Sequence, residues 1–360
     1  LSFFGLIPGS LKGINISRIL KSAEEMVQEC RETADLWANP GACLGTILGF
    51  MALKGRDKAT FLLSPRLRTF GLWLEQLIAE STGKEGKGII PVEGDPPGPS
   101  GVYGSDRFFI QIKMREVVSK QSTLICLKKA GFPVLSLNVP SAGHIGGQFF
   151  LWEFAAAVAG HILGVNPFDQ PDVDLTKKKT QELLKAYRKT GFFPDKKPRV
   201  VEDGINLFSG DRVSTLAEGL KKHLDQASPR DYIVIQAFLS PEAPTTQALQ
   251  KLRALLRDKT GLAVTVGYGP RFLHSTGQLH KGGSPRGIFI QVTAENREDL
   301  AIPDAPGSPR ASLSFGTLCA AQARGDFEAL KSAGRPIIRF RLGREISKGL
   351  ARIAAAVEES

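Results

Sequence analysis

The chain has 360 residues and a formal net charge of +11, with 42% hydrophobic and 23% charged residues. This composition is typical of a soluble globular protein and excludes a disordered or fibrous chain. The length suffices for two ordinary domains or one large domain. A positive excess attracts phosphates or nucleic acid, but the basic residues do not form one long block. Nucleic-acid binding is therefore the minor hypothesis.

The cysteines and the apolar stretches bear on compartment and membrane contact. Four cysteines lie far apart and lack the paired spacing of a metal site, so we predict reduced thiols in a cytoplasmic protein and no metal. The apolar stretches 40–53 and 149–165 are too short or too interrupted to span a bilayer, so we expect no membrane contact. The cysteines are Cys30, Cys43, Cys126 and Cys319.

Helical and strand patterns alternate along the first half of the chain, which predicts a mainly parallel sheet covered on both faces. Ser17 is a suitable N-cap for the first helix, and Pro40 begins the second. The predicted helices cover residues 17–34, 40–53, 66–80, 115–129, 149–163 and 172–189. The predicted strands cover residues 60–63, 88–92, 108–113 and 133–138.

A second α/β set follows a connector that is rich in Lys, Pro and Gly. We therefore predict an α/β fold with a doubly wound sheet and an appended smaller α/β region, divided as 1–189, connector 190–211, and 212–360. Similar strings at 109–112 and 289–292 favour two related units, although four residues are little evidence. The later strands are predicted at 231–238, 262–266, 287–293 and 336–342, and the helices at 245–258, 317–333 (broken at Gly325) and 345–357, with a loop at 302–312.

The segment 164–173 joins two predicted helices. The first helix ends at Asn-Pro, and acidic residues in the first turn of the second complement its dipole. Gln170 and Lys177 are about two helical turns apart, so we expect them on one face, within reach of one ligand. The alternative is an amphipathic helix with a surface lysine, because Lys178 and Lys179 follow directly.

Glu80 lies near the end of the helix 66–80, in Ala-Glu-Ser-Thr-Gly-Lys, at the rim of the apolar stripe. Gly83 is a natural C-cap. A partly buried carboxylate at this place suits a general base. From the residues alone, a solvated glutamate in a final helical turn is the better interpretation.

Two glycine-rich strings, at 267–271 and 280–283, surround His274. Glycines let backbone amides approach a phosphate closely, and Arg271 and Lys281 supply positive charge. A glycine-rich loop alone is a weak signal, and a histidine that caps the following helix is the alternative interpretation.

Three strings, Phe-Gly-Leu-Ile-Pro at 4–8, Glu-Ser-Thr-Gly-Lys at 80–84, and Asn-Pro-Phe-Asp-Gln-Pro at 166–171 with Lys177, resemble the C-terminal half of phosphoglucose isomerase. The resemblance covers about residues 1–180 and implies a sugar-isomerase (SIS) type of sheet. It also implies a cytoplasmic homodimer that interconverts glucose 6-phosphate and fructose 6-phosphate through a cis-enediol without a cofactor. Glu80 would move the proton, Lys177 would contact the ring oxygen or C1 end, and Gln170 would orient the phosphorylated hexose or the helix that carries Lys177.

Many bacterial members carry Asp-Leu-His-Ser-Met-Gly-Gln about twenty residues after the catalytic glutamate. This chain has Tyr103 in that region, and a similar string with His274 appears at 272–278. The resemblance makes His274 the ring-opening group, with Tyr103 or His280 as alternatives, and Arg271 and Lys281 as substrate-binding cations. This combination is most similar to the isomerase part of bifunctional transaldolase/phosphoglucose isomerases.

Typical members of this family have an arginine and a Ser/Thr-rich sugar-phosphate-binding half upstream of the position that corresponds to 4–8. We therefore expect the chain to be truncated at its N-terminus. The main alternative function is a non-catalytic sugar-phosphate-binding module, and a basic nucleic-acid-binding protein is a third hypothesis.

Overall fold

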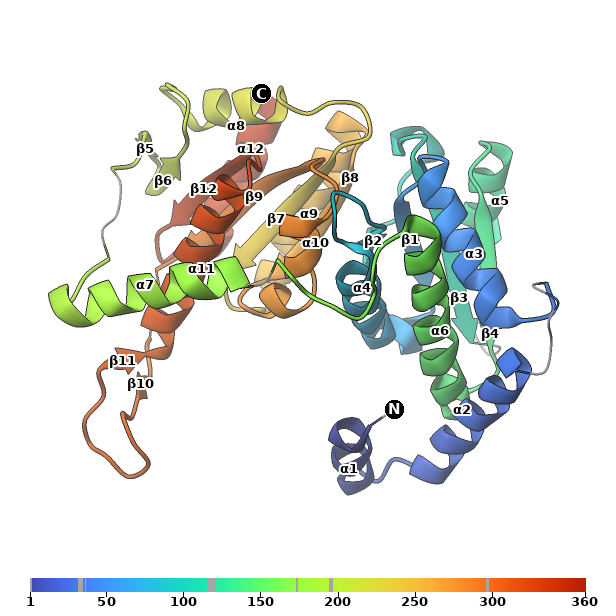
Figure 1. Ribbon diagram of the computed structural model, residues 1–360. Coiled ribbons are helices and arrows are strands. Elements are labelled where there is room, and N and C mark those ends of the chain that lie inside the picture. Colours follow the sequence, from blue (N-terminus) through green and yellow to red (C-terminus); the bar gives the residue numbers. More distant parts are fainter. Residues whose placement is uncertain are drawn as a thin grey trace. The chain divides into compact units, whose positions relative to one another are not determined.

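The computed structural model describes residues 2–31, 35, 37–114, 121–172, 174–193, 197–295 and 298–360. The chain divides into two compact units, the first formed by Leu1–Ser100 with Ser105–Asp169 and the second by Gly101–Gly104 with Gln170–Ser360. Each unit has its own β-sheet and helices (Figure 1). The predicted α/β fold class is therefore confirmed.

The first unit contains a four-stranded, fully parallel sheet with the strand order β2-β1-β3-β4. Alternate residues of the central strands, among them Phe61 and Ile110, enter one hydrophobic core. Long apolar runs such as those of β1 and β3 are typical of buried parallel strands. The strands are β1 (Lys58–Leu63), β2 (Ile90–Val92), β3 (Arg107–Met114) and β4 (Val134–Val139).

Three helices of the first unit, α3, α4 and α6, contribute Leu48, Leu74 and Trp152 to this core. Asn39 caps α3 by accepting a hydrogen bond from the Ala42 amide, and α6 ends at Gly164 in the left-handed conformation. Part of the predicted helix 115–129 lies outside the described residues. The helices are α1 (Phe3–Leu11), α2 (Ile16–Arg31), α3 (Pro40–Leu53), α4 (Arg68–Thr82), α5 (Gln121–Lys129) and α6 (Ile145–Leu163), with short 3₁₀ turns η1 (Pro65–Leu67), η2 (Ser100–Val102) and η3 (Ala142–His144).

The second unit contains a six-stranded sheet with the order β5-β6-β12-β9-β7-β8. Strands β12, β9, β7 and β8 are parallel, and β6 pairs antiparallel with both β12 and β5. The strands are β5 (Val200–Glu202), β6 (Ile205–Phe208), β7 (Tyr232–Phe238), β8 (Ala263–Tyr268), β9 (Gly287–Ala294) and β12 (Ile337–Leu342), and β10 (Ala301–Ile302) pairs separately with β11 (Leu313–Ser314).

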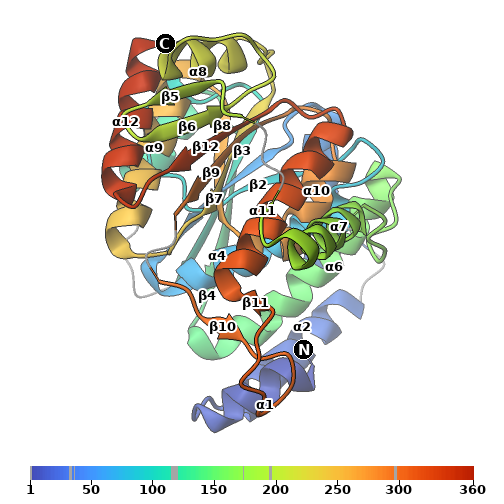
Figure 2. The ribbon, with the colours of Figure 1, turned by 90° about the vertical axis from the view of Figure 1, so that its left-hand side faces the viewer.

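Helices cover both faces of this sheet (Figure 2). Helices α8, α9 and α12 pack with Ile235, Ile290 and Phe340 in the main core, while η4 and α11 cover Phe238 on the other face. Helix α7 packs along α11. The sheet of the second unit is thus doubly wound, whereas the prediction placed the doubly wound sheet in the first half of the chain. The helices are α7 (Asp174–Thr190), α8 (Leu216–Leu224), α9 (Ala243–Thr260), α10 (Gly277–Gly282), α11 (Phe315–Ser332) and α12 (Ile346–Glu359), with the 3₁₀ turn η4 (Arg271–His274).

The boundary of the second unit differs from the predicted division 1–189, 190–211 and 212–360. Its long segment begins at Gln170, and α7 belongs to it because this helix packs on α11. Residues of the predicted connector form β5 and β6, which insert Val200 and Leu207 into the core. The sheet of the second unit is therefore larger than that of the first unit, although the prediction gives the C-terminal region the smaller size.

Helix α11 is continuous through Gly325, so the predicted break at this glycine is wrong. A Cβ atom added at Gly325 would lie 2.5 Å from Thr180 Oγ1 and 3.0 Å from the Thr180 amide nitrogen. The glycine therefore permits the close approach of α7 and α11 rather than ending a helix.

Three further predictions concern thiols, membrane helices and the repeated strings. All four cysteines are free thiols. No helix in the described part of the chain combines the length and apolarity that a membrane crossing needs. The strings at 109–112 and 289–292 lie on β3 and β9, each flanked by two parallel strands, and they place Gln111 and Gln291 in buried positions.

Candidate functional site

Glu80 lies half-buried in the last turn of α4 and accepts a hydrogen bond from Gln76 Nε2 at 3.3 Å. The end of the helix is well fixed. Thr82 Oγ1 donates to the Ile78 carbonyl at 2.7 Å and accepts from the Ile89 amide at 3.0 Å. The Glu80 carboxylate is therefore carried by a defined turn at the start of the segment that leads to β2.

Lys84 connects the Glu80 motif with the Asn166 motif, although Lys84 and Asn166 are 82 positions apart. Only 1% of the Lys84 side chain is exposed. Its Nζ donates to the Asn166 carbonyl at 2.7 Å and to the Asp169 carbonyl, and it lies 3.1 Å from Asp169 Oδ1. A buried ammonium thus holds the two motifs of the first unit together.

Lys87, in the same loop, acts on the end of α6. Its Nζ donates to the Leu163 carbonyl at 2.9 Å. The last carbonyls of a helix lack intrahelical partners and carry partial negative charge, so they attract cations. Lys84 and Lys87 together fix the path of the chain from α6 to Asp169. Sequence reasoning missed this role of Lys84, and its place inside the motif Glu-Ser-Thr-Gly-Lys was the available signal.

The structure corrects the expectation that Gln170 and Lys177 share a helix face. Helix α7 begins at Asp174, so Gln170 lies in the irregular segment before it, and Val173 lies outside the described residues. The physical reason is Pro171, since a proline disfavours the helical conformation of the residue before it. Both side chains are exposed, and Lys177 Nζ lies 3.5 Å from Asp174 Oδ1.

Within the second unit, Gln278 fastens the segment before α7 to α10. The fully buried Gln278 accepts from the Asp172 amide at 3.0 Å and donates from Nε2 to Asp172 Oδ2 at 2.6 Å. A Cβ atom at Gly282 would lie 1.9 Å from the same carboxylate oxygen. The glycine-rich string 280–283 therefore serves the close approach of Asp172 to α10.

The two cations predicted to bind phosphate differ in their surroundings. Arg271 is exposed on η4. Lys281 is buried and forms an ion pair with Asp326 Oδ1, whose side chain is fully buried. This pair joins α10 to α11, and a role of Lys281 in phosphate binding stays a prediction.

The three candidates for ring opening also differ in exposure. His274 is exposed at the end of η4. Tyr103 is buried, with the Arg257 guanidinium 5.5 Å from its ring centre. His280 is buried, and its burial together with the charges of Lys281 and Arg335 places its pKa well below the usual value, so the ring is neutral. Of the three, His274 is the one with an exposed side chain.

The residues described here offer no group of three or more His, Cys, Asp or Glu side chains that could hold a metal ion.

Comparison with known proteins supports the resemblance over part of the chain. No family model matches. Glucose-6-phosphate isomerase of Clostridium tetani is 31% identical over 240 residues, which are 55% of this chain and 52% of the relative. That of Caldanaerobacter subterraneus is 30% identical over 225 residues, which are 51% and 49%. The chain thus spans about half the length of the curated relatives that it matches.

A solved glucose-6-phosphate isomerase from Chlamydia trachomatis is 9% identical, and the match covers 96% of this chain and 69% of that chain with a TM-score of 0.27. This structural likeness is too weak to bear on the fold or the function. The comparison with known proteins therefore depends on sequence similarity.

Proposed function

We propose that this protein is an aldose–ketose isomerase that interconverts glucose 6-phosphate and fructose 6-phosphate. The buried contact of Lys84 with Asn166 and Asp169 is the observation that supports the proposal most, because it joins two motifs of the resemblance in the folded first unit. The similarity to glucose-6-phosphate isomerases over about half of the chain supports the same reaction.

We assign the proton transfer to Glu80. The carboxylate takes the proton from C2 of the open-chain aldose while O1 gains a proton, which gives a cis-enediol. The same proton then returns to C1 as O2 loses its proton, which gives the ketose. No electrons leave the substrate, so the reaction balances without a redox partner. A positioned general base of this kind contributes typically about 10²- to 10⁴-fold in rate.

The remaining roles follow from chemistry and exposure. His274 is exposed, and an imidazole both donates and accepts protons near neutral pH, which ring opening requires. Lys177 holds Asp174 only in a solvent-exposed pair, a contact of little energy, so its ammonium exchanges that partner readily for a substrate oxygen. Gln170 offers an exposed amide that orients the substrate.

The two cations near His274 have different proposed roles. Arg271 is exposed and contacts the phosphate. Lys281 holds α10 in place through Asp326.

The test is the substitution Glu80→Gln in the full-length protein, with Glu25→Gln as the matched control because Glu25 is exposed on α2. We expect Glu80→Gln to lower kcat at least about 10²-fold with little change in KM, since it removes a general base but keeps the shape of the side chain. The control is expected to keep kcat within about twofold, the margin of an exposed surface change. A coupled assay of fructose 6-phosphate formation measures both.

Solvent exchange at C2 gives a second readout, because only a C2 proton-transfer mechanism exchanges this hydrogen. Full activity of the Glu80→Gln variant would remove Glu80 from the mechanism. Binding of fructose 6-phosphate by the unaltered protein without turnover would instead support a non-catalytic sugar-phosphate-binding module.

A further inference from the structure

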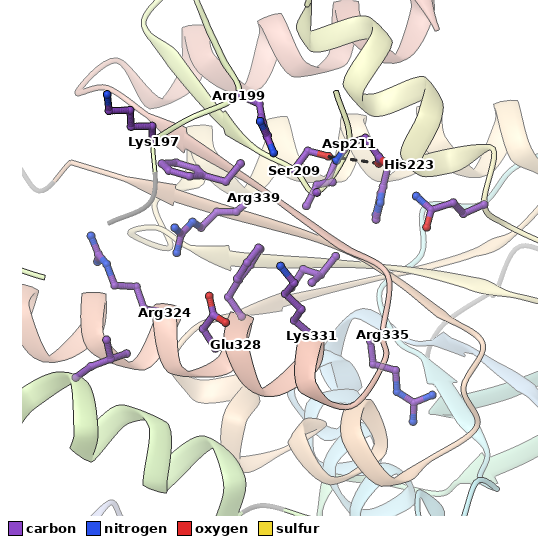
Figure 3. A pocket seen from close by; sticks show the side chains of 17 residues that line it. Lys197, Arg199, Ser209, Asp211, His223, Arg324, Glu328, Lys331, Arg335 and Arg339 are labelled. Carbon is purple, nitrogen blue, oxygen red and sulfur yellow. Dashed lines mark hydrogen bonds between the residues drawn. The ribbon is translucent and has the colours of Figure 1, made fainter. Parts of the chain in front are cut away.

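A cavity of about 700 Å³ lies inside the second unit, between strands β6 and β12 and helix α11 (Figure 3). This volume is within the range of small-molecule sites. Ile337 and Ile338, the first residues of β12, are among its lining residues. Arg271 and His274 follow the opposite end of the parallel strand β8 and do not line the cavity. The cavity is therefore distinct from the predicted ring-opening group.

The walls of this cavity carry a strong excess of positive charge. Asp211 and Glu328 are the acidic side chains among its lining residues. Against these two stand six basic side chains, Lys197, Arg199, Arg324, Lys331, Arg335 and Arg339. A concave surface lined by one sign of charge concentrates ligands of the other sign.

Arg339 has a fixed orientation at the centre of this charge. Its guanidinium carbon lies 4.5 Å from the ring centre of Phe208 and 4.9 Å from that of Phe327. Stacking of this kind contacts the faces of the guanidinium, whose N–H donors lie in its plane. A planar fork of donors held in this way suits a phosphate or carboxylate, which accepts two parallel hydrogen bonds.

Two further cations reach the cavity from opposite walls, Lys331 from α11 and Arg199 from the segment before β5 (Figure 3). Both are exposed, and neither has a carboxylate within ion-pair distance in the described part of the chain. Arg335 differs, because it donates to the carbonyls of Lys281 and Gly283 at 2.7 Å each and points away from the centre of the cavity (Figure 3). Arg335 thus stabilises the cavity wall through these hydrogen bonds, while Lys331 and Arg199 can bind an anion.

The far end of the cavity is polar, and the Asp211 carboxylate lies there beside His223 and Ser209 (Figure 3). His223 Nε2 lies 2.9 Å from the Phe289 carbonyl, which only accepts, so Nε2 carries the proton and Nδ1 is an acceptor. Burial lowers the pKa of His223 to about 4, so the ring is uncharged at neutral pH. Ser209 and Gln226 line the same end. Hydroxyl groups of a ligand find hydrogen-bond partners here.

We propose that this cavity binds a small organic phosphate, with the phosphate between Arg339, Lys331 and Arg199 and the hydroxyl-bearing part toward His223. The small volume of this concave site, about 700 Å³, favours a small molecule over nucleic acid, which is bound along an extended basic surface. This site does not depend on the isomerase function, since none of the residues assigned to that reaction lines it.

The test is isothermal titration of the full chain with AMP, ribose 5-phosphate and inorganic pyrophosphate at constant ionic strength. We expect saturable binding of one organic phosphate per chain. Lys331→Met is expected to weaken it at least about tenfold, the effect of losing one charge-assisted hydrogen bond. The matched control is Lys251→Met, an exposed lysine on α9 at the opposite face of the sheet, with a change below about twofold.

Four results would overturn the proposal. These are the absence of saturable binding of both organic phosphates at millimolar concentration, an equal loss in both lysine variants, tighter binding of pyrophosphate than of either organic phosphate, and displacement of the organic phosphate by an oligonucleotide with a steep salt dependence. Unchanged unfolding of the Lys331→Met variant in urea verifies that a loss of binding is local.

Discussion

Replacement of Lys84 by methionine tests the contact on which the proposed function depends. Methionine keeps most of the apolar stem of the side chain but removes the ammonium, and it leaves the carbonyls of Asn166 and Asp169 without their donor. Lys87→Met is the matched control, because Lys87 also donates to the end of α6 but is exposed to water.

The expected magnitudes differ because of burial. Hydrogen bonds from a charged donor contribute about 1.5–3 kcal/mol each, and a buried acceptor left unsatisfied adds its desolvation cost. The Asp169 side chain is 52% exposed, so its ion pair with Lys84 adds little. We expect Lys84→Met to lower the free energy of unfolding by about 3–4 kcal/mol. We expect less than about 1 kcal/mol for Lys87→Met, because water replaces the lost donor.

Fluorescence measures the effect on the first unit alone, because all three tryptophans, Trp37, Trp73 and Trp152, belong to it. Urea titrations of both variants followed by tryptophan emission therefore report the unfolding of this unit. A loss of about 3 kcal/mol corresponds to a decrease in Tm of roughly 6–12 °C for a unit of this size. Equal losses in the two variants, or a loss below about 1 kcal/mol in Lys84→Met, would refute the reasoning from burial.

Two predictions concern the second unit, which contains all four tyrosines and can be followed by their near-ultraviolet circular dichroism. Gly325→Ala should destabilise the second unit by about 1–3 kcal/mol through the clash with Thr180, although alanine is the better helix former. A gain in stability would show that α7 moves away from α11 to make room for the methyl group. Burial lowers the pKa of His223 to about 4, against 6.5 in the unfolded chain. Below pH 6.5 the unfolded chain therefore binds a proton that the folded chain does not, and the free energy of unfolding decreases until the pH reaches about 4. This decrease amounts to about 3 kcal/mol. Urea titrations at pH 7 and 4.5 measure it, and the His223→Gln variant should lack this part of the pH dependence. An equal difference in unfolding free energy between the two pH values in the variant and the unaltered protein would contradict the assignment.

The predicted elements agree with the structure where one short stretch of sequence contains all the residues that determine the element. Pro40 and the apolar residues after it predicted α3 with its bounds, and the apolar run before Phe238 predicted β7. In contrast, β5 and β6 lie in the segment 190–211, which is predicted to be a connector. Their hairpin turn is Asp203-Gly204, both at positive φ, and an Asp-Gly between apolar residues is a strong hairpin signal. This feature of the sequence could have predicted the two strands.

The candidate site was less accessible to sequence reasoning, because burial of a charged side chain depends on distant parts of the chain. Lys84 follows a helix-ending glycine and resembles an exposed loop lysine, and its burial arises from the carbonyls of the segment after α6. The spacing of Gln170 and Lys177 predicts a shared helix face, but Pro171 disfavours the helical conformation at Gln170, and α7 begins only at Asp174.

Strand β12 alternates apolar residues with arginines, a pattern typical of a strand with one face in water. The cationic cavity lies on the arginine face and explains why this pattern occurs in the interior of a sheet. In β12, Ile338 and Phe340 enter the main core, and the alternating Arg339 points to the other face. However, β12 lies between β6 and β9, and α11 lies along the second face, so Arg339 is only 9% exposed.

Charges that are covered in this way require compensation from acidic side chains or from a ligand. Helix α11 offers Asp326 and Glu328 near this face, and Asp326 is already paired with Lys281. Glu328 and Asp211 are the acids of the cavity wall, and three of the cations around them, Lys197, Arg199 and Lys331, are exposed. In the proposed complex the organic phosphate adds negative charge beside the exposed Lys331 and Arg199, and Arg339 reaches it from its place between Phe208 and Phe327.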